Sequence, residues 1–208
     1  SCNQLALLFS YICVFLNPVF MNSALAQVHG PPESEISHAD TIYNIPSITA
    51  TYRDTEIDID GVVDEKAWEK ANPTTRFLQR EPVEGALPEE KTEVRVMYDE
   101  GALYVGAKMY DSKPHLIGDQ LVRRDQWGQF DYFTFYVDSN DDRRTGYEFQ
   151  VSAAGVQRDR YLFNDTKNDD AWNAVWESAI QRTNKGWSVE MRIQLSQISY
   201  NPSDEEQT

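Results

Sequence analysis

The chain has few of the residues that most catalytic and metal chemistry needs. Both cysteines, Cys2 and Cys13, lie near its start, so the rest can form neither a disulfide nor a thiolate zinc site. The histidines are His29, His38 and His115, which leaves no cluster for a triad. No glycine-rich phosphate loop is present, and no pair among the 34 Asp and Glu residues stands out as a glycosidase pair. These absences argue against catalysis by this segment.

Positive charge is also scarce. The chain carries 19 Lys and Arg against 34 Asp and Glu, for a net charge of -15. Phosphate groups would be repelled, so nucleic acid and anionic membrane surfaces are poor partners. Hydrophobic residues make up 40% and aromatic residues 12% of the 208 positions. This composition predicts one globular domain, and the aromatic content favours β structure.

The longest apolar run, residues 5–16, is too short to span a membrane, which takes about twenty residues. It is followed by Ala24 and Ala26, whose small-x-small spacing is typical of signal peptidase cleavage. We therefore expect residues 1–26 to be a signal peptide and the protein to be exported. A signal peptide begins with Met and basic residues, whereas this sequence begins with Ser1, so we expect the recorded start to be incomplete.

The next segments divide the chain. Residues 27–55 are polar and interrupted by prolines, which predicts a leader or linker with one edge strand near 45–51. Asp64 is in position to cap a short helix over 65–70 that carries Trp68 inward. We expect the folded module to occupy residues 56–200. The acidic residues 201–208 stop without a closing strand, which suggests truncation there too.

From residue 92 onward, apolar and polar residues alternate with a period of two, in short runs separated by turn signals. The expected strand segments are 94–98, 103–109, 133–137, 147–151, 156–163, 175–183 and 187–193. No long helical period and no internal repeat is visible. The sequence therefore predicts an all-β fold, an antiparallel β-sandwich of immunoglobulin-like or jelly-roll-like form, with one short N-terminal helix.

Four motifs in order give a family resemblance: DGVVDEKAW at 60–68, DQWGQFDYFTFYVD at 125–138, GYEFQV at 146–151 with a following glycine, and GWSVEMRI at 186–193. Together they resemble family 9 carbohydrate-binding modules, which share a DOMON-like β-sandwich. One departure is Gln194, where the family has proline. The resemblance extends over residues 56–200 and implies a non-catalytic module that binds oligo- or polysaccharide.

The sequence is most similar to a subgroup of exported bacterial proteins in which the module precedes a barrel-like C-terminal domain. This implies a Gram-negative protein of the periplasm, outer membrane or extracellular space, associated with polysaccharide breakdown or uptake. The alternative is an interaction or plug domain for that barrel, without sugar binding. Haem binding, as in some DOMON domains, is a third reading. His115 is the only His in the module to serve as an axial ligand, beside strand methionines such as Met97.

Family 9 modules clamp a terminal sugar between two Trp rings. Trp68 and Trp187 fit core positions, because one lies in the expected helix and the other is in phase with buried strand residues. Trp127 lies in a charged loop, so we expect it to be one platform. Trp172 and Trp176 share a face whether the segment is helical or extended, and one of them is the candidate second platform. For all three, packing as a structural Trp is the competing interpretation.

Polar groups would complete such a site. Arg123 and Arg124 could fork onto hydroxyls or an acidic sugar, and Glu148 and Gln150 share one strand face that is either a binding sheet or an ordinary solvated face. No cofactor is required. The loop residues Asp138, Asn140 and Asp142 have the spacing that begins a calcium loop, although Arg143 stands where the EF-hand glycine would be. A second oxygen-rich cluster, Asp165, Asn168, Asp169 and Asp170, is another candidate for structural calcium. In the first loop, Arg143 and Arg144 could neutralise the acidic residues instead of calcium.

Overall fold

The computed structural model describes residues 48–140, 142–164 and 167–199. The predicted signal peptide at 1–26, most of the leader and the tail at 201–208 lie outside these residues. The elements run in the order β1 (Thr51–Tyr52), η1 (Trp68–Lys70), β2 (Thr92–Tyr98), β3 (Ala102–Tyr110), η2 (Pro114–Leu116), β4 (Tyr132–Val137), β5 (Thr145–Ser152), β6 (Gln157–Phe163), β7 (Lys167–Asp169), β8 (Trp176–Thr183), β9 (Gly186–Gln194) and η3 (Leu195–Gln197).

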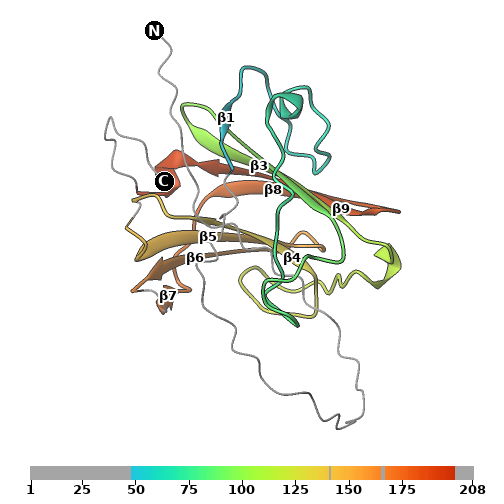
Figure 1. Ribbon diagram of the computed structural model, residues 1–208. Coiled ribbons are helices and arrows are strands. Elements are labelled where there is room, and N and C mark those ends of the chain that lie inside the picture. The colour runs from blue at the N-terminus through green and yellow to red at the C-terminus, as the bar shows by residue number, and fades with distance from the viewer. Residues whose placement is uncertain (1–47, 141, 165–166, 200–208) are drawn as a thin grey trace, which may run out of the picture.

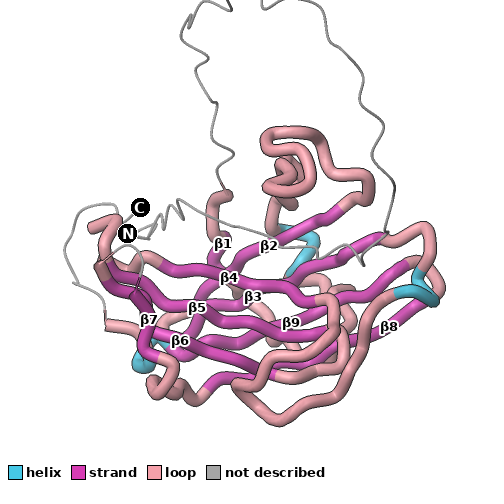
Figure 2. The backbone as a smooth tube through the Cα atoms, turned by 90° about the horizontal axis from the view of Figure 1, so that it is seen from below, coloured by secondary structure: helices cyan, strands magenta, loops and turns pink. Residues whose placement is uncertain are grey.

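The strands form two sheets that stack as layers, with their strands running in nearly the same direction (Figures 1 and 2). One sheet has five strands in the order β1-β2-β3-β9-β8, and the other has four in the order β4-β5-β6-β7. The predicted β-sandwich is therefore confirmed. All pairs are antiparallel except β1 with β2, which pair in parallel. This two-residue pair lies at the edge of the five-stranded sheet and is the one departure from the antiparallel pattern among the described strands.

The main core lies between the sheets and explains the alternation in the sequence. Phe133, Phe135 and Phe149 point inward from β4 and β5 and are 0% exposed. They meet the inward residues of the facing sheet, which include Val105 and Met191. Each large apolar side chain buried this way contributes about 1.5–3 kcal/mol. Ile48 and Ala50 also belong to this core, so the folded part includes positions that the sequence placed in the leader.

A second, smaller core covers the outer face of the five-stranded sheet. Residues 57–71 cross this face and bury Trp68 against Tyr104 and Met97. Gly106 makes the close approach feasible, because a Cβ there would stand 3.0 Å from the Trp68 ring. Trp68 is 2% exposed, as predicted, and Trp187 is also buried, at 4%. The outer face of the five-stranded sheet is thus covered, whereas the other outer face carries the polar residues described below.

The predicted short helix is smaller than expected. η1 is a single 3-10 turn whose N-cap residue is Ala67, and no side chain caps it. The expectation that Asp64 caps a helix over 65–70 is therefore wrong. The local turn is held by tertiary packing of Trp68 rather than by a cap. No described helix is long and apolar enough to cross a membrane.

Candidate functional site: the outer face of the four-stranded sheet

The outward residues of β4, β5 and β6 stand in register across the sheet. Thr134, Gln150 and Arg158 form one row, and Tyr136, Glu148 and Arg160 form the next. The same period of two that buries Phe149 places these polar side chains on the opposite face. The sheet therefore presents an ordered polar surface, which we call the β4–β6 face.

Two arginines of β6 organise this face. Arg160 Nε donates to Glu148 Oε1 at 3.1 Å, and its Nη2 donates to the other carboxylate oxygen. Arg158 Nη2 lies 3.3 Å from Asp170 Oδ1, and Arg160 Nε lies 3.9 Å from the same oxygen. The two arginines are partly buried, whereas Asp170 is largely exposed. These ion pairs therefore hold the guanidinium groups at the boundary between the sheet and the solvent.

Trp127 lies at the edge of the β4–β6 face and is 55% exposed. Its ring packs against Tyr132 at 5.3 Å and Phe130 at 5.7 Å between centroids. The Arg158 guanidinium carbon lies 5.5 Å from the ring centroid, a cation–π distance. Three neighbouring side chains therefore hold the ring in place, while more than half of the residue's surface remains accessible to solvent. The structure thus leaves one indole ring exposed at the edge of the β4–β6 face.

Trp172 and Trp176 lie elsewhere. Trp176 is 6% exposed, packs edge-on to Phe149 at 5.4 Å and donates from Nε1 to the Asp159 carboxylate. Trp172 is half-buried against Tyr147 at 5.0 Å and Phe149 at 5.9 Å. Both rings pack on the core side of β5, opposite the β4–β6 face. The burial of Trp176 argues against it as the second platform, whereas that role for the half-buried Trp172 stays a prediction. Even spacing predicts that the two rings share a side but not whether that side faces solvent.

Glu148 and Gln150 do share one face, as predicted, but they are 1% and 3% exposed. The Glu148 carboxylate is occupied by Arg160, so it is a structural anion rather than a free acceptor. The Gln150 side chain makes no hydrogen bond within the described part of the chain. This amide is not among the wholly enclosed atoms that lack a partner, so the mostly buried side chain still has donors and acceptors to offer at the surface.

The two loop arginines behave differently. Arg123 is exposed and forms no ion pair with any described residue, so it is free to reach a ligand beside Trp127. Arg124 instead donates to the Asp159 and Gln157 side chains of β6 and to the Ala174 carbonyl. Arg124 is thus a positioning residue that fastens the Trp127 loop to the sheet, which corrects its predicted role in sugar contact.

The sequence reasoning missed Tyr132, Arg158, Arg160 and Asp170 on the β4–β6 face, and Asp159 beneath it. A signal was present, because Arg158 and Arg160 alternate with Asp159 just after the Ala154–Gly155 turn. Pairing β6 with β5 would have placed both arginines beside Glu148 and Gln150. Their place beside Glu148 and Gln150 depends on the pairing of β5 with β6, which is a tertiary feature.

The predicted calcium loop uses its carboxylates locally. Asp138 accepts from the backbone N–H groups of Asn140, Asp142 and Arg143 at 2.8–3.4 Å. Asp142 accepts from Thr145 and the Arg144 N–H, and these bonds hold its pKa below the usual value. Hydrogen bonds inside the loop thus satisfy the oxygens that calcium would need, and the residues present do not fit the ion well.

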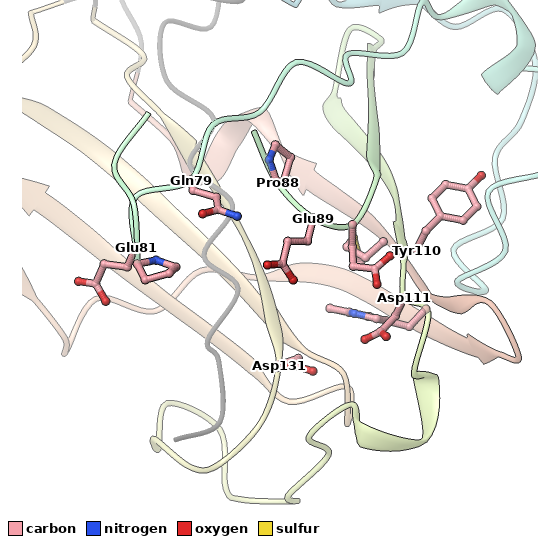
Figure 3. Close-up of a pocket in the computed structure, with 11 residues that line it drawn as sticks. Gln79, Glu81, Pro88, Glu89, Tyr110, Asp111 and Asp131 are labelled. Carbon is pink, nitrogen blue, oxygen red and sulfur yellow. The ribbon is translucent and has the colours of Figure 1, made fainter. Parts of the chain in front are cut away.

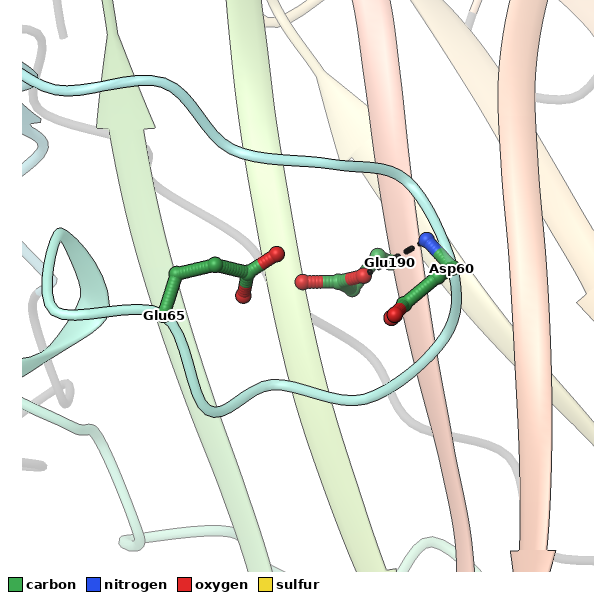
Figure 4. Close-up of side chains that lie close together, drawn as sticks. All are labelled: Asp60, Glu65 and Glu190. Atoms are coloured by element: carbon green, nitrogen blue, oxygen red, sulfur yellow. Dashed lines mark hydrogen bonds between the residues drawn. The ribbon is translucent and has the colours of Figure 1, made fainter.

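Among the described residues, three acidic side chains lie close together, namely those of Asp60, Glu65 and Glu190 (Figure 4). Each has a carboxylate oxygen within 4.8 Å of an oxygen of the other two. Glu190 accepts from Trp68 Nε1 at 2.8 Å and from the Asp60 and Gly61 N–H groups at 3.1 and 2.9 Å. Glu65 Oε2 is buried without a hydrogen-bond partner. Glu190 therefore anchors the segment that covers the outer face of the five-stranded sheet.

This cluster predicts a pH dependence of stability. Burial raises the pKa of the Glu190 carboxyl from 4.5 to about 7, and the negative charge of Glu65 acts in the same direction. The folded protein therefore binds the proton more tightly than the unfolded chain, so this group's stabilisation is full below pH 4.5 and is lost as the pH rises to about 7.

We expect Glu190→Gln to flatten that dependence. Melting temperatures measured from pH 4.5 to 8 should fall for the wild type across this window and change less for the variant. Glu69→Gln, at an exposed position of η1, serves as the control and should follow the wild type. Parallel wild-type and Glu190→Gln curves would show that Glu190 does not titrate there.

A β-sandwich with one face closed by a packed segment, and the other carrying an exposed Trp beside ordered polar groups, is the architecture of a ligand-binding module. The family "Carbohydrate family 9 binding domain-like" matches residues 59–208, and the chain belongs to it. The family resemblance seen in the sequence is thus confirmed. Comparison with curated proteins gives no match.

Solved structures show the same fold. A family 9 carbohydrate-binding module from Caldicellulosiruptor kristjanssonii in complex with cellotriose is 21% identical, with a TM-score of 0.51 over 71% of this chain and 67% of that one. A family 9 module from the same organism in complex with glucose is also 21% identical, with a TM-score of 0.52 over 74% of this chain and 71% of that one. A putative carbohydrate-binding protein from Bacteroides uniformis is 10% identical, with a TM-score of 0.54 over 73% and 75%.

Proposed function

We propose that the protein is a non-catalytic module that binds neutral oligosaccharide on the β4–β6 face, with one sugar ring stacked on Trp127. The exposed Trp127 ring beside unpaired polar groups carries this proposal. Sugars present apolar C–H faces to aromatic rings, and planar amide or guanidinium groups bond their hydroxyls. Family membership and the sugars bound by the similar structures support the same reading.

The polar partners follow from the register. Gln150 stands next to Arg158 across β5 and β6, and its amide can both donate to and accept from hydroxyls. Arg158 already contacts Trp127 and therefore lies close to the stacked ring. Arg123 completes the set from the loop. Glu148 acts indirectly, because it holds Arg160 in position.

The wider setting is also a proposal. We infer that the protein is exported, on the strength of the predicted signal segment and the absence of cysteine from residue 14 onward. The module would then serve polysaccharide breakdown or uptake in the periplasm, at the outer membrane or outside the cell. It would act as the front part of a protein with a barrel-like C-terminal domain.

Titration calorimetry with cellotriose tests the proposal, together with a panel of other neutral oligosaccharides. We expect at least one of them to bind, and Gln150→Leu to weaken it about tenfold, because the site then loses a hydrogen-bonding amide of similar size. Gln181→Leu, at an exposed position of β8 on the other sheet, is the matched control and should bind like the wild type. Absence of binding across the panel would refute sugar binding and favour the plug-domain alternative.

A further inference from the structure

Asp170 places a carboxylate on the solvent side of the β4–β6 face. Its Oδ1 atom lies 3.3 Å from Arg158 Nη2 and 3.9 Å from Arg160 Nε. The Asp170 side chain is 62% exposed, whereas those of the two arginines are 20% and 22% exposed. Arg160 also holds Glu148, which is buried. Asp170 is therefore the exposed anion that the two arginines share.

The strand register fixes the position of Asp170. β7 pairs with β6 as far as Asp169, which stands opposite Tyr161. Asp170 is the next residue, so the same antiparallel register places it beside Arg160. Asp169 Oδ1 accepts from the Ala171 backbone N–H at 2.9 Å, and the chain turns away from the sheet there. The position of the Asp170 carboxylate therefore follows from strand pairing and not from the ion pairs alone.

Asp170 also lies close to the proposed sugar platform. The Arg158 guanidinium carbon is 5.5 Å from the Trp127 ring centroid, and Asp170 pairs with the same guanidinium. A sugar ring stacked on Trp127 would therefore have Arg158 beside it. A guanidinium binds a carboxylate through two parallel N–H bonds, so this position would suit the carboxylate of a uronic acid.

The Asp170 carboxylate changes which ligands this position favours. A second carboxylate bound to Arg158 would lie close to Asp170, and like charges at such a distance repel each other. The hydroxyls of a neutral sugar carry no charge, and Arg158 has N–H groups besides the one that points to Asp170 to donate to them. Asp170 therefore disfavours an acidic ligand but not a neutral one.

We propose that Asp170 is a specificity-determining residue, which makes the β4–β6 face select neutral sugars over uronic acids. This inference rests on the proposed function of that face. Asp170 takes the place that the carboxylate of an acidic ligand would occupy and keeps Arg158 paired. Without the Asp170 charge, Arg158 becomes available to the carboxylate of a uronic acid.

The cavity in Figure 3 is unfavourable for acidic sugars as well. It has a volume of about 320 Å³ and lies between residues 79–90, the end of β3 and the start of β9. The residues that line it include no Lys, Arg or His but five acidic side chains, namely Glu81, Glu89, Glu90, Asp111 and Asp131. An anion would be repelled there. We therefore expect an acidic sugar to bind the β4–β6 face rather than this cavity.

Titration calorimetry with two matched trisaccharides tests the role of Asp170. One is cellotriose, and the other is its uronic counterpart, in which the sixth carbon of each ring is a carboxylate. We expect the wild type to bind cellotriose at least about tenfold more tightly. Asp170→Asn keeps the shape of the side chain but removes its charge, so the affinity for the uronic trisaccharide relative to cellotriose should rise about tenfold. The rise should shrink in about 0.5 M salt, because salt screens exposed charges.

Matched variants separate the position of Asp170 from its charge. Glu177→Gln also removes an exposed carboxylate, which is 56% exposed and pairs with Arg192 at 2.8 Å on the five-stranded sheet. It should leave the ratio of the two affinities unchanged. Adding Arg158→Gln to Asp170→Asn should abolish the gain, since the uronic carboxylate then loses its partner.

The outcomes also distinguish this inference from the proposed function. No gain in Asp170→Asn, or an equal gain in Glu177→Gln, would overturn the role of Asp170 and leave the proposed function standing. Equal wild-type affinities for the two trisaccharides would overturn that role too. Absence of binding by the wild type to cellotriose and to every other neutral oligosaccharide of the panel would instead refute the proposed function, and this inference with it.

Discussion

Replacing Asp159 with alanine should lower the free energy of unfolding by about 3 kcal/mol. The carboxylate is 1% exposed and receives the Arg124 guanidinium, the Ala174 N–H at 2.6 Å and the Trp176 indole at 3.3 Å. Its removal leaves two buried N–H donors without acceptors and one arginine without its anion. Each group then carries a desolvation cost that nothing offsets.

Denaturant unfolding followed by circular dichroism measures this effect. Asp170→Ala is the matched control, because Asp170 pairs with Arg158 but its side chain is 62% exposed, and such surface pairs contribute at most about 1 kcal/mol. If both substitutions lower stability equally, Asp159 is not the anchor described here. Asp159→Ala should also weaken sugar binding, since Arg124 ties the Trp127 loop to the sheet through this carboxylate.

Trp127→Ala should reduce oligosaccharide affinity at least about thirtyfold, which corresponds to the 2 kcal/mol typical of a central aromatic contact. The fold should be little affected, because the ring is 55% exposed and lies at the sheet edge. Trp127→Tyr should retain part of the affinity, since a smaller ring still stacks.

Titration calorimetry with cellotriose measures the loss. Tyr52→Ala is a suitable control, because Tyr52 is another exposed aromatic residue, at 46%, but stands on β1 of the five-stranded sheet. Wild-type affinity in Trp127→Ala, or an equal loss in Tyr52→Ala, would show that Trp127 is not a specific platform.

The alternation of residues predicted most of the fold because it reflects local geometry. The β2–β3 hairpin and the inward face of β5 follow from the period of two alone. The pairing of β3 with β9 joins residues that are far apart in the sequence, such as Val105 and Met191. No local pattern predicts such a long-range pairing. The helix expected over 65–70 is only a 3-10 turn over 68–70, and no side chain caps it. Packing of Trp68 against the five-stranded sheet fixes this segment instead.

The site was predictable only where exposure followed from local composition. Trp127 lies in a charged loop with no strand period, and it is exposed. Trp176 follows an equally polar segment, yet it is buried because Asp159, seventeen positions earlier, accepts its indole N–H. Arg124 was misassigned for the same reason, since its partner lies on another strand. Long-range acceptors decide these roles, and the sequence does not display them.

The most direct test of sugar binding on the β4–β6 face is to follow the five Trp indole N–H resonances in ¹⁵N-labelled protein during titration with cellotriose. The Trp127 resonance should shift in proportion to ligand bound. The resonances of Trp68, Trp172, Trp176 and Trp187 should stay close to their starting positions, because none of these rings lies on the β4–β6 face. Shifts at Trp172 or Trp176 with none at Trp127 would contradict the account.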